Sequence, residues 1–160
     1  MAMFRSLVRK KQQLTEEECL RLLQEEKRGV LSVIGDDDYP YGMPLNHYYD
    51  PADGKIYFHS GKAGHKIDAL QRCSKASYCI YDSGFRKDGE WALNIRSVIV
   101  FGRVQTVTDH QKALEICRAL SYRFTQDDAY IQKEIEHFGA GVLVLALTPE
   151  QITGKLVNEA

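Results

Sequence analysis

The feature that most constrains the fold is a series of six apolar, β-branched runs, most of them separated by turn residues. The runs are residues 29–34, 41–49, 56–59, 76–81, 96–107 and 141–147. Asp50-Pro51-Ala52-Asp53-Gly54 is a strong turn signal between two of them. A parallel sheet would need a helix after nearly every strand. The pattern instead predicts a mainly β domain, a small barrel flanked by helices.

Helix signals occur at four places. Thr15 and Glu18 form a capping box, and Leu14 and Cys19 are spaced as a hydrophobic staple around it. The other three helices are expected to begin near Gly64, at a Thr108 cap with Gln111 in the capping-box position, and from about Thr125.

Pro44 lies inside the second run, in Tyr41-Gly42-Met43-Pro44-Leu45-Asn46-His47. Proline has no N–H to donate to a neighbouring strand, so we expect this strand at an edge, a bulge or an opening of the sheet. Such a strand exposes backbone amides and carbonyls to a flat heterocycle. A plain bulged edge strand explains the same residues equally well.

Length and composition indicate one globular domain over residues 1–160. The chain has 160 residues, 44% hydrophobic and 27% charged, with a formal net charge of −1. This balance indicates neither a nucleic-acid partner nor an anionic membrane, and no apolar run approaches the roughly 20 residues of a membrane helix. Residues 1–11 are basic but contain no signal-peptide h-region, so we expect a surface arm there.

The cysteines form no C-x-x-C pair. We expect Cys19 and Cys117 on apolar helix faces as buried thiols, which favours a reducing, cytoplasmic location. One conceivable zinc set matches no common zinc motif, so no metal is expected. That set is His59, His65, Cys73 and Cys79.

The stretch GKIYFHSGKAGHKIDAL, residues 54–70, concentrates polar groups at a strand-to-helix junction. If Lys66 lies in the first helical turn, its ammonium joins the unpaired amides near Gly64 and the positive end of the helix dipole. Gly61 and Gly64 let backbone approach an anion, and the Ser60 hydroxyl can donate to it. These features are typical of a phosphate site. A solubilised turn remains an alternative, since neither G-x-x-x-x-G-K-[ST] nor G-x-G-x-x-G is present.

Taken together, GVLSVIGDDDYPYGMPLNHYYDPADGKIYFHSGKAGHKIDAL resembles the pyridoxamine 5′-phosphate oxidase-like flavoproteins. It is similar above all to the flavin-nucleotide-binding branch that includes the nitroimidazole-resistance reductases. The likeness continues through ASYCIY, RSVIVFGRVQTVTDHQKALEICRAL and ITGK, and covers about residues 12 to 156. It implies an FMN-binding split β-barrel and a homodimer with FMN at the subunit interface.

The resemblance also implies roles for particular residues. His65 and Lys66 match the basic pair on the FMN phosphate, and His59 and Ser60 match the strand end at the ribityl-phosphate region. Gly64 belongs to the same phosphate site. Four residues match the strand that lies along the isoalloxazine ring: Met43, Pro44, Leu45 and Asn46. The second subunit is expected to contribute Trp91, Arg96 and Ser97.

One departure bears on the reaction. The vitamin-forming oxidases end in an arginine-bearing motif that binds the substrate phosphate, whereas this chain has no arginine after Arg123. Oxidation of pyridoxamine phosphate is therefore not expected. The predicted function is an FMN-dependent oxidoreductase that takes electrons from NAD(P)H and reduces a small nitroaromatic or quinone-like molecule. No side chain is assigned as catalytic.

Two alternatives remain open. The first is a flavin-binding carrier or sensor without turnover of its own. The second is a haem-binding or haem-degrading protein, with His47, His59 and His65 as possible iron ligands. Their spacing favours none of the three.

Overall fold

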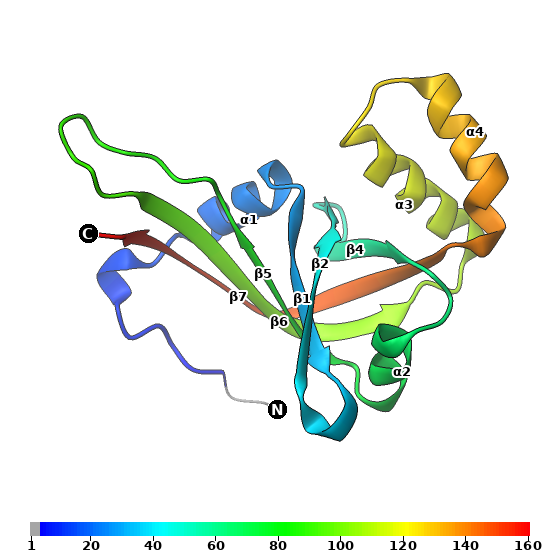
Figure 1. Cartoon of the computed structure of the whole chain (residues 1–160), viewed down its shortest axis with the longest axis horizontal. Coiled ribbons are helices and arrows are strands. Elements are labelled where there is room, and N and C mark those ends of the chain that lie inside the picture. Colours follow the sequence, from blue (N-terminus) through cyan, green and yellow to red (C-terminus); the bar gives the residue numbers. More distant parts are fainter. Residues whose placement is uncertain (1–3) are drawn as a thin grey trace.

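One sheet of seven antiparallel strands, in the order β2-β1-β5-β6-β7-β4-β3, forms the body of the molecule (Figure 1). The computed structural model describes residues 4–160. The strands are β1 Arg28–Ile34, β2 Pro40–Asn46, β3 Tyr48–Asp50, β4 Lys55–Ser60, β5 Lys75–Tyr81, β6 Asn94–Thr106 and β7 Leu143–Asn158. The ends of the sheet curl toward each other, so that β2 contacts β4 without pairing to it. The predicted split barrel is confirmed.

Four helices flank this sheet. They are α1 Glu16–Glu25, α2 His65–Arg72, α3 His110–Tyr122 and α4 Asp128–Phe138. Helix α1 packs on β6 and β7, while α3 and α4 form a hairpin beside β4 and β7 (Figure 1). Short 3₁₀ turns occur at Lys10–Gln12, Asp36–Asp38 and Gly139–Gly141.

The core lies inside the curl of the sheet. Alternate residues of β1, β5 and β6 point inward, as the period of two along a strand requires. Tyr78 and Phe58 are fully buried there, with their rings edge to face at 4.9 Å between centroids. Cys19 and Leu23 of α1 pack against the same cluster, so the first helix closes one end of the barrel.

Several local predictions are confirmed. The Thr15 hydroxyl accepts from the Glu18 amide, and the Glu18 carboxylate accepts from the Thr15 amide, which completes the capping box. Both members of the staple, Leu14 and Cys19, are buried. Pro44 lies in β2, an edge strand that pairs only with β1, opposite Val30. An edge position of this kind is where a sheet tolerates a residue without an N–H.

Other boundaries differ from the prediction. Asp109, not Thr108, caps α3, and its carboxylate accepts from the Lys112 amide. Helix α4 begins at Asp128, after an Asp127 carboxylate that accepts from the Tyr130 amide.

Two strands also differ. Run 41–49 divides into β2 and β3 at His47, whose ring is turned into the core. The last run extends far beyond residue 147, because β7 continues to Asn158. It pairs with β6 across a register shift between Phe101 and Gly102.

The N-terminal arm lies partly outside the described residues, since residues 1–3 are not among them. Phe4 stacks on Phe101, with 5.4 Å between ring centroids, so this part of the arm contacts the sheet. Cys19 is buried as predicted, whereas Cys117 is only partly buried and lines a cavity; all four cysteines are free thiols. Within residues 4–160, no helix combines the length and the apolar character that crossing a membrane requires.

Candidate functional site

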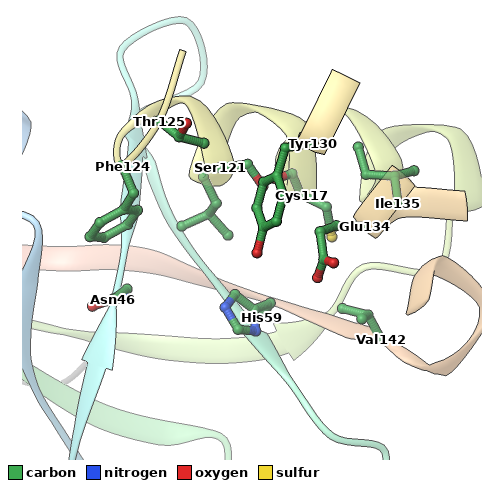
Figure 2. Close-up of a pocket in the computed structure, with 11 residues that line it drawn as sticks. Asn46, His59, Cys117, Ser121, Phe124, Thr125, Tyr130, Glu134, Ile135 and Val142 are labelled. Carbon is green, nitrogen blue, oxygen red and sulfur yellow. The ribbon is translucent and has the colours of Figure 1, made fainter. Parts of the chain in front are cut away.

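The candidate site lies where the barrel is split, between β2 and β4. Asn46, at the end of β2, and His59, on β4, both line two adjoining cavities. The smaller, about 310 Å³, extends over Arg28, Pro44 and Leu45. The larger, about 450 Å³, lies beneath the α3–α4 hairpin, as Figure 2 shows. Through these two shared residues, the helical pocket adjoins the edge strand β2.

The end of β2 is held by its neighbours. The Asn46 side-chain oxygen accepts from Arg28 Nε at 2.9 Å. One residue on, the fully buried His47 donates from Nε2 to the Leu23 carbonyl at 2.7 Å. A carbonyl oxygen only accepts, so Nε2 carries the proton and Nδ1 accepts from the Tyr78 hydroxyl at 2.6 Å. That hydroxyl also lies 3.3 Å from the Leu45 carbonyl.

Burial lowers the pKa of His47 to about 4, with a smaller contribution from Arg123, so the ring is neutral at pH 7. The histidine fixes the backbone of residues 45–47 and is closed off from either cavity. Sequence reasoning treated His47 as a possible iron ligand. No local pattern distinguishes it from an exposed histidine, because its partners come from α1 and β5.

At the junction of β4 and α2, the structure leaves a cation without a partner. Lys66 lies in the first turn of α2, as predicted, and is half-buried. Burial lowers the pKa of its ammonium. Within residues 4–160 it makes no hydrogen bond or ion pair. A half-buried charge of this kind is costly unless something anionic approaches it.

The backbone around Lys66 is also open. Gly64 is the N-cap of α2 with φ 130°, a conformation that other residues rarely adopt, and no side chain caps the helix there. A Cβ on Gly64 would meet nothing within 4 Å. The first amides of α2, which have no intrahelical acceptor, are therefore accessible from outside.

His59 and Ser60 adjoin this junction. Ser60 is buried, and its hydroxyl donates to the Gly61 carbonyl at 3.0 Å, so it orders the loop. His59 faces the opposite side of the strand and lines both cavities. Burial lowers its pKa, and so does the nearby Lys66 charge. His59 therefore connects the Lys66 junction with the two cavities.

His65 is engaged with the turn between β1 and β2. Its ring stacks on Tyr41 at 4.1 Å between centroids, and Nε2 accepts from the Asp36 amide at 3.2 Å. The Asp36 carboxylate lies 3.7 Å from the same nitrogen. With Nε2 acting as acceptor, the proton of the neutral ring is on Nδ1, which is the nitrogen left to donate to a ligand.

The remaining predicted residues lie elsewhere in the chain. Trp91 is 76% exposed, and Arg96 pairs with Asp82 at 3.4 Å and stacks over Phe85. Both belong to the β5–β6 hairpin, which projects away from α2, α3 and α4 (Figure 1). Ser97 lies in β6 opposite Tyr81. One chain alone does not bring these residues to the Lys66 junction.

Metal ligands do not gather here. Within the part of the chain that the structure describes, no three His, Cys, Asp or Glu side chains are placed to hold one ion. The partly exposed polar groups of the site are instead arranged around an anion position and two cavities.

Comparison with protein-family models shows which family the chain belongs to. The model described as pyridoxamine 5′-phosphate oxidase matches residues 15–156, which is most of the chain. The chain belongs to the pyridoxamine 5′-phosphate oxidase-like family. The match spans β1 to β7, and so includes both edges of the split barrel. Comparison with curated protein sequences gives no match.

Solved structures share the family fold at low sequence identity. A candidate 5-nitroimidazole antibiotic resistance protein from Bacteroides thetaiotaomicron superposes with a TM-score of 0.74 and 19% identity, over 91% of this chain and 87% of that one. The conserved hypothetical protein Rv2991 from Mycobacterium tuberculosis superposes with a TM-score of 0.77 and 17% identity, over 94% of this chain and 90% of that one. An FAD-binding protein from Mycobacterium smegmatis superposes with a TM-score of 0.66 and 20% identity, over 92% of this chain and 99% of that one.

Proposed function

We propose that this protein is a flavin-dependent oxidoreductase that binds FMN and reduces a small nitroaromatic or quinone. The observation that carries the proposal is the unpaired, half-buried Lys66 ammonium at the open N-terminus of α2, beside an exposed edge strand. Family membership supports it, as do structural relatives described as an FAD-binding protein and a candidate nitroimidazole-resistance protein.

The residues present fit a flavin mononucleotide. Lys66, the α2 amides near Gly64 and Nδ1 of His65 would hold the phosphate, with His59 and Ser60 at the ribityl end. The backbone of residues 43–46 would lie along the ring. When bound, the flavin supplies the electron transfer from NAD(P)H to the acceptor.

An apolar row on the outer face of the sheet supports a homodimer. Pro44, Val30, Cys79 and Ile99 lie side by side across β2, β1, β5 and β6. Val30 and Ile99 are each more than a third exposed. Because the row ends on β2, a second copy that covers it would also reach the site. Such a copy would be the source of Trp91, Arg96 and Ser97.

One arginine supports the expectation that pyridoxamine phosphate is not the substrate. Arg123 is the last arginine of the chain, and its guanidinium donates to the carbonyls of Gln24 and Glu26. It holds the end of α1, and this role in the fold argues against a second role in binding a substrate phosphate. The acceptor is therefore expected to lack that group.

The test is the absorption spectrum of the purified protein, the mass of the small molecule released from it, and anaerobic mixing with NADH or NADPH. We expect FMN, bleaching by a nicotinamide, and return of the colour on adding nitrobenzene or a benzoquinone. Flavin that stays oxidised with both donors favours the carrier or sensor, and a Soret band favours haem. A colourless protein that refuses micromolar FMN overturns the proposal.

A further inference from the structure

We propose that the cavity beneath the α3–α4 hairpin is a substrate subsite for a small aromatic molecule with a cationic or N–H-donating group, bound to the Glu134 carboxylate. The inference rests on the proposed function, because a flavin on β2 is what would place a reaction at the mouth of this cavity. It adds the chemical class of the substrate and the residue that selects it.

The walls of the cavity suit a flat apolar body. Its volume is about 450 Å³, within the range of roughly 300 to 1,000 Å³ that small-molecule sites occupy. Apolar side chains form most of the lining; Leu120 and Phe124 come from the α3 side, and Ile135 and Val142 from α4 and the segment before β7. The Phe124 and Tyr130 rings offer faces for aromatic contact.

Three polar groups converge on this apolar space. Figure 2 shows the Tyr130 hydroxyl and the Glu134 carboxylate directed toward the space above His59. Among residues 4–160, no hydrogen bond or ion pair satisfies any of the three side chains. The nearby Ser121 hydroxyl, by contrast, donates to the Cys117 carbonyl at 2.9 Å. Tyr130 and His59 are partly open to solvent, so these groups lack partners only within the protein. A few convergent polar groups in a mainly apolar cavity are typical of a ligand site.

The charge of the cavity selects the kind of ligand. Among the described residues of the lining, Glu134 carries the only formal charge, and it is partly buried. His59 is predominantly neutral at pH 7, since burial and Lys66 lower its pKa. A partly buried carboxylate is stabilised by a donor or a cation, and disfavours a second anion. The Tyr130 hydroxyl can complete the hydrogen bonds of the same ligand.

The position of the cavity connects it with the flavin site. Asn46 and His59 line this cavity and also the smaller one over Pro44 and Leu45. A ligand beneath the helical hairpin would therefore adjoin the strand assigned to the flavin ring. Lys66 is near enough to His59 to lower its pKa, but it is not among the residues that line the Glu134 cavity.

The experiment compares two probes that share the nitrobenzyl frame. 4-Nitrobenzylamine is protonated at neutral pH, whereas 4-nitrobenzyl alcohol is neutral. Calorimetric titration of the flavin-loaded protein should show tighter binding of the amine, by about tenfold or more for one charge-assisted contact. In Glu134→Gln the preference should vanish, with alcohol binding and flavin affinity unchanged. Glu115→Gln, an equal charge change at an exposed position of α3 outside the lining, should keep it.

A persistent amine preference in Glu134→Gln, equal binding of the two probes to the wild type, or binding of neither would overturn the inference. A loss of flavin affinity in Glu134→Gln would assign the cavity to the cofactor and overturn it as well. The titrations are repeated on the flavin-free chain, where the amine preference must also appear. Failure to bind flavin counts against the proposed function, whereas failure to prefer the amine counts only against this subsite.

Discussion

Lys66 and His47 are both basic side chains that the fold buries at least in part, but they differ in their hydrogen-bond partners. His47 gives up its charge and satisfies both ring nitrogens, one on the Leu23 carbonyl and one on the Tyr78 hydroxyl. Lys66 has no such partner among the described residues, although burial also lowers its pKa. The first arrangement stabilises the fold, and the second is typical of a binding residue.

Replacing Lys66 tests the anion position. In Lys66→Ala, FMN affinity should fall about tenfold or more, because a charge-assisted contact contributes about 1.5–3 kcal/mol. Folding should change little, since the ammonium makes no contact that the fold needs. Fluorescence titration of FMN and thermal unfolding measure the two effects. Lys62→Ala, at an exposed position of the loop before α2, is the matched control. Equal FMN affinity in Lys66→Ala and wild type would remove the phosphate assignment.

The pH dependence of unfolding tests the burial of His47. Burial lowers its pKa from the ordinary 6.5 to about 4, so the unfolded chain binds the proton more readily. Stability is therefore fully present above pH 6.5 and declines as pH falls toward 4, by on the order of 3 kcal/mol.

The variant His47→Gln keeps a donor for the Leu23 carbonyl but has no ionisable ring. Its free energy of unfolding in urea should fall less steeply between about pH 7 and pH 4.5 than that of the wild type. Identical slopes for the two proteins would mean that His47 is not held neutral by the fold.

At the scale of single elements, the sequence predicted the features that depend on neighbouring residues alone. The capping box of α1 and the edge position of β2 both follow from residues within a few positions. Thr108 and Asp109 show the limit, since either side chain can cap a helix and the sequence offers both in succession. The C-terminal half of β7 escaped prediction because its residues become a strand only by pairing with β6, some fifty positions away.

The irregularity in β6 gives a test at this scale. A Cβ on Gly102 would overlap the Thr148 carbonyl oxygen, a backbone atom that cannot move without displacing β7. Gly102→Ala should therefore destabilise the protein by about 1–3 kcal/mol or more, measured by urea unfolding. Gly61→Ala is the control, because its Cβ would meet only the Ala63 carbonyl at 4.0 Å. Equal losses in the two variants would contradict the role of the close approach.

At the scale of the whole molecule, the candidate site assembles pieces that are distant along the chain. The Lys66 junction could be predicted because one short stretch holds all its groups. The Glu134 cavity could not, since it needs β2, β4 and the α3–α4 hairpin to meet. The sequence predicted a helix from about Thr125 without showing which part of the sheet that helix would cover.

The apolar outer row predicts how the molecule associates. Ile99→Glu would place an unpaired charge at the β6 end of the proposed subunit contact, so the dimer should weaken by roughly tenfold or more. Sedimentation velocity measures this, and FMN titration should show a parallel loss. Gln105→Glu adds the same charge at an exposed position of β6 outside the row. A monomeric wild type overturns the dimer, and an unaffected Ile99→Glu dimer places the contact elsewhere.

The split between β2 and β4 has a mechanical consequence. The two strands touch, yet no ladder of backbone bonds joins them. Separating β2 from β4 disrupts side-chain contacts. Separating any two neighbouring strands of the sheet also breaks backbone hydrogen bonds. We therefore expect the contact between β2 and β4 to separate more easily than any pair of hydrogen-bonded strands. Such a separation would widen the entrance to the site for a larger ligand, while the paired strands keep their geometry.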